Sequence, residues 1–325
     1  MNLSKNKYLV SVIIVNWNGK KWLKKCLNSL QNQTFKSIEI VLVDNASSDG
    51  SLEYLKKYYP KVNIIKNKEN LGYPKAANIG IKKSNGDYLL LINNDAWVDK
   101  YFIEKLFNFY STNSYSVISP VSMKYSGKVA GNMLPSIDPT GSTAYFFPIS
   151  RKDKLFFLSV CYFCSKNEYL KTQGFDDNHF AYFEDVDWFW RLTLMGKKFN
   201  YVEDVFVYHE GAGSTGKGIK YNMFLWRNQN TLQTLLKNYS FATLIIILPI
   251  YILQNLMEIL FFLTLLKFDI AGSYIQGWVF NIKNFNKIMK KRKWIQERRK
   301  VSDLEILKKM YLGPAKLKML LSYKL

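Results

Sequence analysis

The N-terminal part of the chain alternates continuous apolar runs with amphipathic segments. Tyr8–Trp17 is a mostly apolar run rich in β-branched residues, typical of a strand that is buried on both faces. Residues 19–33 instead carry apolar side chains at helical spacing. The alternation continues, and it predicts strands at Ile38–Val43, Val62–Ile65 and Tyr88–Ile92 and helices at Leu52–Tyr59 and Lys75–Lys82. Strands that alternate with helices indicate βαβ units, and therefore an α/β fold with a Rossmann-like, mostly parallel sheet.

The pattern changes after residue 125. Ser126–Arg151 is rich in Gly, Pro and Ser and predicts a long loop that leads to a second half-sheet. Leu155–Cys164 and Phe199–Tyr208 are predicted as buried strands of that half. Between them we expect a short helix at Lys166–Lys171 and a second helix at Glu184–Met195, whose first turn is strongly acidic.

Polar residues follow three of the predicted strands. The sequence NWN occupies residues 16–18, DN occupies 44–45 and NND occupies 93–95. In open parallel sheets, ligands bind beyond the carboxyl ends of the strands, so these residues are candidates for ligand contact. No G-x-G-x-x-G follows the first strand, so a dinucleotide-binding interpretation lacks its phosphate contact. Taken alone, Asp44 fits a ribose-binding acid and a helix cap equally well.

Composition and charge narrow the class of protein. The 325 residues are 48% hydrophobic, which is long and apolar enough for a sizeable core and excludes a disordered chain. The net charge is +21, and residues 283–300 alone carry nine Lys or Arg against one Glu. Such a basic segment favours contact with a polyanion, either a nucleic acid or an anionic membrane surface.

The cysteines and the N-terminus point to a reducing compartment. Three cysteines are too few for a disulfide framework. Cys161 and Cys164 form a C-x-x-C inside an apolar run, which we interpret as a pair of buried thiols rather than a zinc or redox site. The first apolar stretch runs directly into Asn16, which does not fit the layout of a signal peptide. We therefore expect the catalytic part to face the cytoplasm.

Three features suggest chemistry on a phosphorylated substrate. Asp95 stands at a strand end, where a carboxylate can hold Mg²⁺ or Mn²⁺. The stretch YFEDVDW at residues 182–188 places three carboxylates in one helical turn, and His209 follows a later strand. Capping turns, compensation of the helix dipole and a structural histidine are the alternatives for these features taken singly. Together they fit displacement at a nucleotide-diphosphate substrate, with a metal and a separate carboxylate base.

A glycine-rich loop follows His209. From Gly211 it reads G-x-x-x-x-G-K, but Gly218 stands where a P-loop needs Ser or Thr. An ATPase with this loop as its phosphate site is therefore disfavoured. We interpret the glycines as hinges of a lid over a diphosphate, whose oxygens Lys217 would contact.

The motifs, taken in order, resemble the inverting family 2 glycosyltransferases of the GT-A fold, especially their rhamnosyltransferase-like branch. They cover the first two-thirds of the chain. The resembling stretches are VSVIIVNWNG (10–19), VLVDNASSDGS (41–51), NLGYPKAANIG (70–80), LLLINNDAWV (89–98), GFDDNHFAYFEDVDWFWRLTLMG (174–196) and VYHEGAGST (207–215).

The resemblance implies roles on the donor side. Asp44 would contact the nucleotide base with support from Asn16, and Asp95 would hold the metal and the ribose. Asn93 replaces the first acid of the family's D-x-D motif, which puts strict metal dependence in doubt. His209 would be the second metal ligand. The remaining donor-contacting candidates are Lys75, Asn78, Asn94 and Lys217.

The resemblance also implies roles on the acceptor side. Asp185 would be the general base that takes the proton from an acceptor hydroxyl, so that the oxygen attacks the anomeric carbon and inverts its configuration. Glu184 and Asp187 would help to bind the acceptor, and Arg191 would orient the acids. Trp188 and Trp190 fit either sugar stacking or core packing.

The C-terminal third predicts a membrane-associating region. Leu244–Leu266 is long enough to span a bilayer, but Gln254 and Glu258 share one face in its middle, where a carboxylate costs roughly 2.5–3.5 kcal/mol. A single span would also place the basic segment and the catalytic part on opposite sides of the membrane. We expect an interfacial or re-entrant helical hairpin with the basic segment on anionic headgroups; a soluble helical domain is the alternative. No nucleic-acid-binding motif accompanies the basic segment, so a nucleic-acid partner is not expected.

These inferences predict a catalytic GT-A domain at residues 1–225 and a helical, hydrophobic and basic region at 226–325. The predicted function is transfer of a sugar from a UDP- or dTDP-linked donor, with Mg²⁺ or Mn²⁺, to a glycan or polyprenyl-linked acceptor at the cytoplasmic face of the cell membrane. A homo-oligomer is compatible with the sequence. The alternative from another class is a non-catalytic scaffold that binds nucleotide sugars at the membrane.

Overall fold

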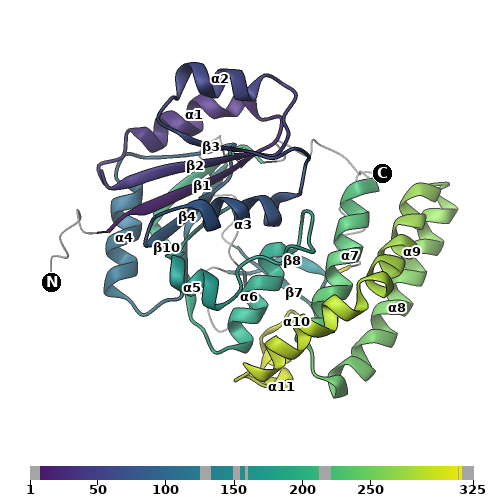
Figure 1. Ribbon diagram of the computed structural model, residues 1–325. Coiled ribbons are helices and arrows are strands. Elements are labelled where there is room, and N and C mark those ends of the chain that lie inside the picture. Colours follow the sequence, from purple (N-terminus) through teal and green to yellow (C-terminus); the bar gives the residue numbers. More distant parts are fainter. Residues whose placement is uncertain are drawn as a thin grey trace. The chain divides into compact units, whose positions relative to one another are not determined.

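The computed structural model describes residues 8–124, 133–148, 154–157, 160–211, 221–313 and 315–316. By its internal contacts the chain forms two compact units (Figure 1). Unit 1 consists of Met1–Gly131, Leu158–Phe180 and Lys198–Lys217. Unit 2 consists of Asn132–Phe157, Ala181–Lys197 and Gly218–Leu325. Each unit therefore combines segments that are far apart in sequence.

Unit 1 is built on an eight-stranded sheet with the order β3-β2-β1-β4-β9-β6-β10-β5. Strands β3, β2, β1 and β4 are parallel neighbours, and β6 and β10 are also parallel. The strand β9 runs antiparallel to β4 and β6, and β5 antiparallel to β10. The strands are β1 (Val10–Asn16), β2 (Ile38–Asp44), β3 (Asn63–Lys66), β4 (Tyr88–Ile92), β5 (Ala96–Val98), β6 (Val117–Lys124), β9 (Cys161–Ser165) and β10 (Phe199–His209).

Helices cover both faces of this sheet because its central strands are apolar on both sides. On one face, Val12 and Ile14 of β1 belong to the core that α1 and α4 complete. On the other face, the helix α3 comes so close that a Cβ on Gly80 would lie 3.0 Å from Ile13 and 2.9 Å from Val43. The helices of unit 1 are α1 (Lys20–Gln31), α2 (Ser51–Tyr58), α3 (Tyr73–Lys83), α4 (Phe102–Thr112) and α5 (Lys166–Lys171).

Unit 2 joins a β-hairpin to a set of helices. The hairpin pairs β7 (Met133–Ile137) with β8 (Thr143–Pro148), and Asp138 closes its turn by accepting from the backbone N–H groups of Thr140 and Ser142. Helix α7 packs on α6, α9 and α10, and α9 packs on α8. The helices are α6 (Glu184–Leu194), α7 (Tyr221–Asn238), α8 (Phe241–Thr264), α9 (Phe268–Lys283), α10 (Phe285–Glu297) and α11 (Asp303–Lys309).

The structure confirms the α/β prediction and corrects parts of it. The sheet is mixed, as the antiparallel β9 and β5 show. The predicted loop at Ser126–Arg151 contains the β7–β8 hairpin, since Asp138 organises a tight turn where composition suggested only loop. The strand predicted at Leu155–Cys164 begins only at Cys161, because Val160 has φ +71°, a backbone conformation outside the β region. The pattern assigned nothing to residues 96–124, where β5, α4 and β6 lie.

The cysteine prediction is confirmed. Cys26, Cys161 and Cys164 are all buried free thiols. Burial raises the pKa of Cys26 to about 12, and the charge of Asp95 adds to the shift, so the thiol is unreactive at neutral pH.

One helix among the described residues, α8, is long and apolar enough to cross a membrane. Only 28% of its most apolar window is buried against the rest of the protein.

Candidate functional site

The carboxyl ends of β1, β2 and β4 bring three predicted donor-binding residues together in unit 1. Asn16 donates its side-chain amide to Asp44 Oδ1 over 3.2 Å, and Asn94 donates to Asn16 Oδ1 over 2.9 Å. Parallel pairing places Asn16 directly opposite Asp44, which is why their side chains meet. We call Asn16, Asp44 and Asn94 the strand-end cluster. All three are at most 5% exposed, so their polar atoms are held by one another.

Gly19 makes room for this cluster. A Cβ on Gly19 would lie 2.1 Å from Asn94 Nδ2 and 2.6 Å from Asn16 Oδ1. The strand-end cluster therefore requires a glycine at the start of α1, and any side chain there would displace its amides.

Further amides extend the cluster: Asn45, a sequence candidate, contacts Asn67 and Asn70, which sequence reasoning missed. Asn45 donates to Asn70 Oδ1 over 2.7 Å and accepts from the Asn67 amide over 3.0 Å and from the Leu71 N–H over 3.1 Å. Asn45 thus ties the end of β2 to the segment before α3. The available signal was its position directly after Asp44, inside the motif VLVDNASSDGS.

The two predicted metal ligands lie next to each other in unit 1. Asp95 follows β4, His209 ends β10, and antiparallel pairing sets His209 opposite Ala96. The distance between His209 Nε2 and Asp95 Oδ1 is 3.0 Å, and Asn93 Nδ2 lies 3.3 Å from the same ring nitrogen. A carboxylate beside an imidazole can hold a divalent ion: the carboxylate oxygen suits Mg²⁺ or Mn²⁺, and imidazole is a common metal ligand.

The other predicted donor-side residues are placed differently. Asn78 donates to the Phe175 carbonyl over 2.9 Å and accepts from the Tyr169 hydroxyl over 2.7 Å, so its amide joins α3 to the segment around α5. Lys75 is exposed on the first turn of α3. Lys217 lies outside the described residues.

The acidic turn at the start of α6, in unit 2, follows an unusual backbone. Tyr182 and Phe183 both have positive φ, +63° and +71°, although neither is glycine. Such residues cost of the order of 1–3 kcal/mol each and are concentrated at functional sites. The side chain of Asn230, on α7, donates to the Ala181 carbonyl over 2.9 Å and to the Tyr182 carbonyl over 2.7 Å. This buried amide therefore holds the turn that presents Glu184 and Asp185.

Glu184 and Asp185 are partly buried at this position. Burial raises the pKa of Glu184 to about 8, with a further contribution from the charge of Asp185. Burial also raises the pKa of Asp185 to about 6, against hydrogen bonds that lower it, chiefly from the Val186 N–H. Glu184 Oε2 is buried and has no hydrogen-bond partner among the described residues. Burial thus brings the titration of this carboxyl pair closer to neutral pH than that of an ordinary carboxyl group, in the range where a carboxylate can exchange a proton.

Asp185 lines a cavity of about 190 Å³ within unit 2. Its other walls come from the hairpin, the turn before α6 and α7, and they combine aromatic rings with a guanidinium. The lining residues are Thr143, Phe157, Tyr182, Phe183, Val186 and Arg227. Aromatic and charged side chains around a carboxylate suit a polar, hydroxyl-bearing ligand.

Asp187 and Arg191 face the interior of unit 2. Asp187 Oδ2 lies 2.9 Å from Arg191 Nε, and Asp187 Oδ1 lies 2.8 Å from Lys237 Nζ of α7. Asp187 is 0%, Lys237 1% and Arg191 4% exposed. Arg191 thus pairs with Asp187, and the three charges fasten α6 to α7. Sequence reasoning missed Lys237, which lies 50 residues after Asp187 in the chain.

Comparison with known proteins decides the family. The sequence profile described as "Glycosyl transferase family 2" matches residues 11–178, about half of the chain. The chain belongs to glycosyl transferase family 2. The matched region contains the strand-end cluster and Asp95, and it ends before the acidic turn of α6.

The family assignment agrees with a curated relative. A cholesterol galactosyltransferase of Borreliella burgdorferi is 27% identical over 249 residues, which cover 71% of this chain and 68% of the relative. Several other curated glycosyltransferases match about a third of this chain, and the chain covers less than half of their own length.

Solved structures of glycosyltransferases share the fold of this family 2 protein. TarS 1-349 of Staphylococcus aureus, solved with UDP-GlcNAc, is 19% identical with a TM-score of 0.52; the match covers 71% of this chain and 67% of that one. GalNAc-T7, solved with UDP, GalNAc and Mn²⁺, is 18% identical with a TM-score of 0.58; the match covers 71% of this chain and 48% of that one. At these identities the similarity establishes the GT-A fold alone.

Burial decides between the two interpretations of the tryptophans of α6. Trp188 and Trp190 are 0% and 1% exposed, so of the two interpretations in the sequence, core packing is the one that holds in this family 2 protein. Trp190 packs edge-on against Tyr239, with ring centroids 4.8 Å apart.

Proposed function

We propose that this protein is an inverting glycosyltransferase that moves a sugar from a nucleoside-diphosphate donor to a hydroxyl of a glycan or lipid-linked acceptor. The observation that carries the proposal is Asp185: a carboxylate with a pKa of about 6, held on a strained turn, in the wall of a cavity of about 190 Å³. A partly buried carboxylate whose pKa is raised toward neutrality suits removal of a proton from a hydroxyl.

The donor is assigned to unit 1. Asp44, supported by Asn16 and Asn94, is proposed to contact the nucleotide base, and Lys75, Asn78 and Lys217 remain candidates for donor contacts. UDP or dTDP is the proposed nucleotide; the solved structures of TarS and GalNAc-T7 hold UDP-GlcNAc and UDP, which supports a uridine nucleotide. Asp95 and His209 would hold Mn²⁺ or Mg²⁺, which, when bound, neutralises charge on the diphosphate.

In the proposed step, Asp185 takes the proton from the acceptor hydroxyl as its oxygen forms a bond to the anomeric carbon. The bond from that carbon to the β-phosphate oxygen breaks, and the nucleoside diphosphate leaves with the electron pair. Attack from the side opposite the leaving group inverts the anomeric configuration. Glu184 is proposed to hydrogen-bond to the acceptor. Asp187, expected from the sequence to help bind the acceptor, is buried against Arg191 and Lys237, so Asp187 and Arg191 are proposed to position α6.

The setting of the reaction is also a proposal. We place the protein at the cytoplasmic face of the cell membrane, within the rhamnosyltransferase-like branch of the family and in cell-surface glycan or glycolipid synthesis. Residues 1–225 would supply the chemistry and 226–325 the membrane association. The name of the Borreliella relative, a cholesterol galactosyltransferase, supports an acceptor that resides in a membrane.

The test is a transfer assay with the full chain. The protein is incubated with UDP- and dTDP-sugars, Mn²⁺ or Mg²⁺ and membrane lipid extract, and the anomeric configuration of the product is read by NMR. Inversion is the expected outcome. A product with retained configuration would contradict the base assignment, and donor binding without hydrolysis or transfer would establish the non-catalytic scaffold instead.

A further inference from the structure

Helix α8 has two different sides. One side is buried at helical spacing through Leu244, Ile247, Tyr251, Asn255, Glu258 and Phe262. The other side carries large apolar residues that are 44–75% exposed, namely Ile245, Ile246, Ile250, Ile252, Leu253, Leu256, Met257 and Leu260, after Phe241 at 69%. A soluble surface of this kind is unusual, because exposed apolar residues normally occur singly.

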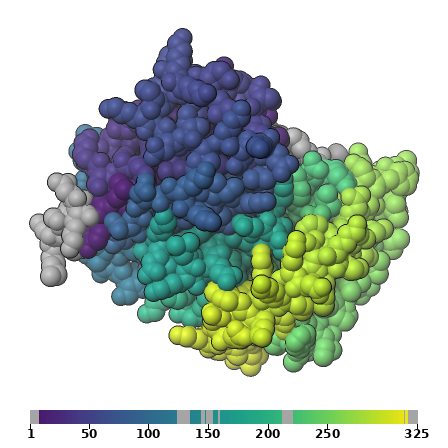
Figure 2. Space-filling model, viewed as in Figure 1, coloured from purple at the N-terminus to yellow at the C-terminus, as the bar shows by residue number. Residues whose placement is uncertain are grey.

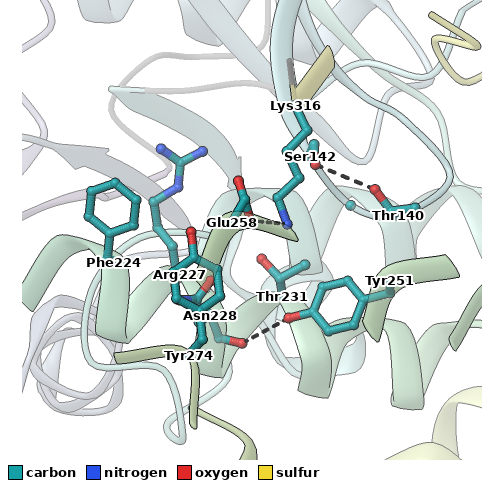
Figure 3. Close-up of a pocket in the computed structure, with 11 residues that line it drawn as sticks. Thr140, Ser142, Phe224, Arg227, Asn228, Thr231, Tyr251, Glu258, Tyr274 and Lys316 are labelled. Atoms are coloured by element: carbon teal, nitrogen blue, oxygen red, sulfur yellow. Dashed lines mark hydrogen bonds and ion pairs between the residues drawn. The ribbon is translucent and has the colours of Figure 1, made fainter. Parts of the chain in front are cut away.

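The buried side of α8 is polar at its centre and is fixed to unit 2. Glu258, 3% exposed, lies with its Oε2 2.6 Å from Lys316 Nζ, and the same ammonium donates to Asn255 Oδ1 over 2.7 Å. Glu258 and Lys316 line a small cavity of about 40 Å³ together with Arg227 and Tyr274. Figure 3 marks the ion pair of Glu258 and Lys316 with a dashed line. To cross a bilayer surrounded by lipid, α8 would have to leave these contacts and expose Glu258 and Asn255 to hydrocarbon, which is costly.

The exposed apolar side continues onto the next helices. On α9, Ile275 is 52%, Val279 42% and Ile282 74% exposed, and Phe285 at the start of α10 is 50% exposed. Helices α8 and α9 pack against each other, and both carry exposed apolar residues. We call the exposed apolar residues of α8 and α9, with Phe285, the apolar face. In Figure 2 the green of α8 and α9 and the yellow of α10 adjoin on the visible surface.

Cations border the apolar face. Lys283, Lys287, Lys290 and Lys293 recur at helical spacing and are all exposed. A groove of about 520 Å³ beside them is lined by Phe241 of α8 and by Met289, Arg292 and Lys293 of α10. The Arg292 guanidinium lies 4.1 Å from the Phe241 ring centroid, which ties the basic helix to the start of α8. An apolar surface edged by cations is complementary to an anionic bilayer. The apolar residues contact the acyl chains, and the cations contact the anionic headgroups.

We infer that the apolar face docks unit 2 onto an anionic lipid bilayer, with α8 and α9 lying in the plane of the headgroup–acyl boundary rather than crossing it. The lysines of α10 contact the headgroups. A second copy of the chain is a weaker candidate for this face, because it would add the same basic helix, whereas an anionic bilayer neutralises it. The cavity at Asp185 belongs to the same unit, so docking would hold the candidate base at the membrane surface, where a lipid acceptor resides.

The first experiment measures partitioning of the full chain into sedimented vesicles. Phosphatidylcholine vesicles with 0 or roughly 30% phosphatidylglycerol span the neutral and anionic cases. The double variant Ile245→Asp/Met257→Asp is expected to weaken partitioning about tenfold or more, since charge enters the acyl region. The matched control is Leu304→Asp on α11, a leucine that is 63% exposed outside the apolar face. Equal loss in both variants would overturn the inference.

The second experiment tests whether the lysines of α10 contact anionic headgroups. Lys290→Glu/Lys293→Glu is expected to abolish the preference for anionic over neutral vesicles, and added salt should do the same to the parent protein. Lys56→Glu/Lys57→Glu, on the exposed side of α2 in unit 1, is the control with the same change of charge. A preference that survives in the α10 variant would contradict headgroup contact.

The third experiment tests whether α8 lies in the plane of the membrane or crosses it. The native cysteines are buried, so single cysteines at Ile246, Leu253 and Leu260, all exposed on one side of α8, can be labelled selectively with an environment-sensitive dye. Quenching by lipids labelled at different depths should report three similar, shallow positions. A deep Leu253 between two shallow positions would mean that α8 spans the bilayer.

Sedimentation velocity of the same protein without vesicles tests whether a second copy of the chain covers the apolar face. If sedimentation velocity shows a dimer that Ile245→Asp/Met257→Asp dissociates, while vesicle binding is unchanged, the apolar face is a subunit interface and the inference is wrong. None of these readouts depends on sugar transfer, so a failure here is distinguishable from a failure of the proposed activity.

Discussion

The strand-end cluster of unit 1 and the acidic turn of unit 2 differ in how their buried polar groups are hydrogen-bonded. In the cluster, Asn16, Asp44 and Asn94 hydrogen-bond to one another while buried, so their positions are set before a ligand arrives. In the acidic turn, Glu184 Oε2 is buried without a hydrogen-bond partner among the described residues, and the preceding backbone is strained. The difference matches the proposed division between groups that bind and groups that react: the proposed binding groups are satisfied, whereas the proposed base lies where proton transfer is favourable.

The largest expected effect is on the reacting side. Asp185→Asn should lower the transfer rate by about 10²–10⁴-fold, because the amide cannot accept the proton. UDP binding, measured by calorimetry, should stay near its parent value, because the proposed nucleotide contacts are all in unit 1. Asp204→Asn, at an exposed acid of β10, is the control. Full activity in Asp185→Asn would remove the base assignment and with it the contrast between the two regions.

The next largest effect is expected on stability, when the buried ion pairs of the helix that carries the acidic turn are removed. Asp187→Leu leaves Arg191 and Lys237 buried without their carboxylate, and we expect a loss of about 3–5 kcal/mol in the free energy of unfolding. Urea unfolding at pH 7 measures it. The matched control is Glu297→Gln, whose partner Arg298 is 47% exposed and 3.5 Å away; it should cost less than about 1 kcal/mol. Similar losses in both variants would mean that the buried charges do not fasten α6.

On the binding side, Asp44→Asn is expected to weaken UDP binding about 10- to 100-fold, as when a charge-assisted hydrogen bond is lost. The turnover number at saturating donor should change little, which distinguishes this variant from Asp185→Asn. Calorimetry and a donor titration of the transfer rate measure the two quantities. A fall in turnover with unchanged affinity would assign Asp44 to the reacting side.

The smallest expected effect concerns pH. The pKa of Glu184 is about 8 in the folded protein, above the ordinary 4.5, so the folded state binds more protons than the unfolded state between these values. Stability therefore falls as pH rises through this range. Glu184→Gln should remove part of that fall and stabilise the protein at pH 8 by about 1 kcal/mol or more. Melting temperatures at pH 5 and pH 8 test it; an unchanged pH dependence would show that Glu184 is already well solvated.

The sequence predicts the strand-end cluster better than the acidic turn, for a physical reason. Parallel pairing forces the ends of β1 and β2 together, so apolar runs followed by Asn16 and Asp44 place those residues without further information. The acidic turn depends on partners that no local pattern indicates. Asn230 and Lys237 look like ordinary polar positions of a helix, and only tertiary packing brings them to Tyr182 and Asp187. Trp190 likewise fitted two interpretations until its burial was known.

The contacts of α7 bear on how this protein can be produced for experiments. The sequence suggests removing residues after 225 to obtain a soluble catalytic fragment, but that cut discards Asn230 and Lys237, which hold the turn and the helix that carry Asp185. A cut after α8 would discard Lys316, the partner of Glu258. Purification without detergent is therefore better sought by polar replacement of Ile246, Leu253 and Leu260, which changes the surface and keeps the helices in place.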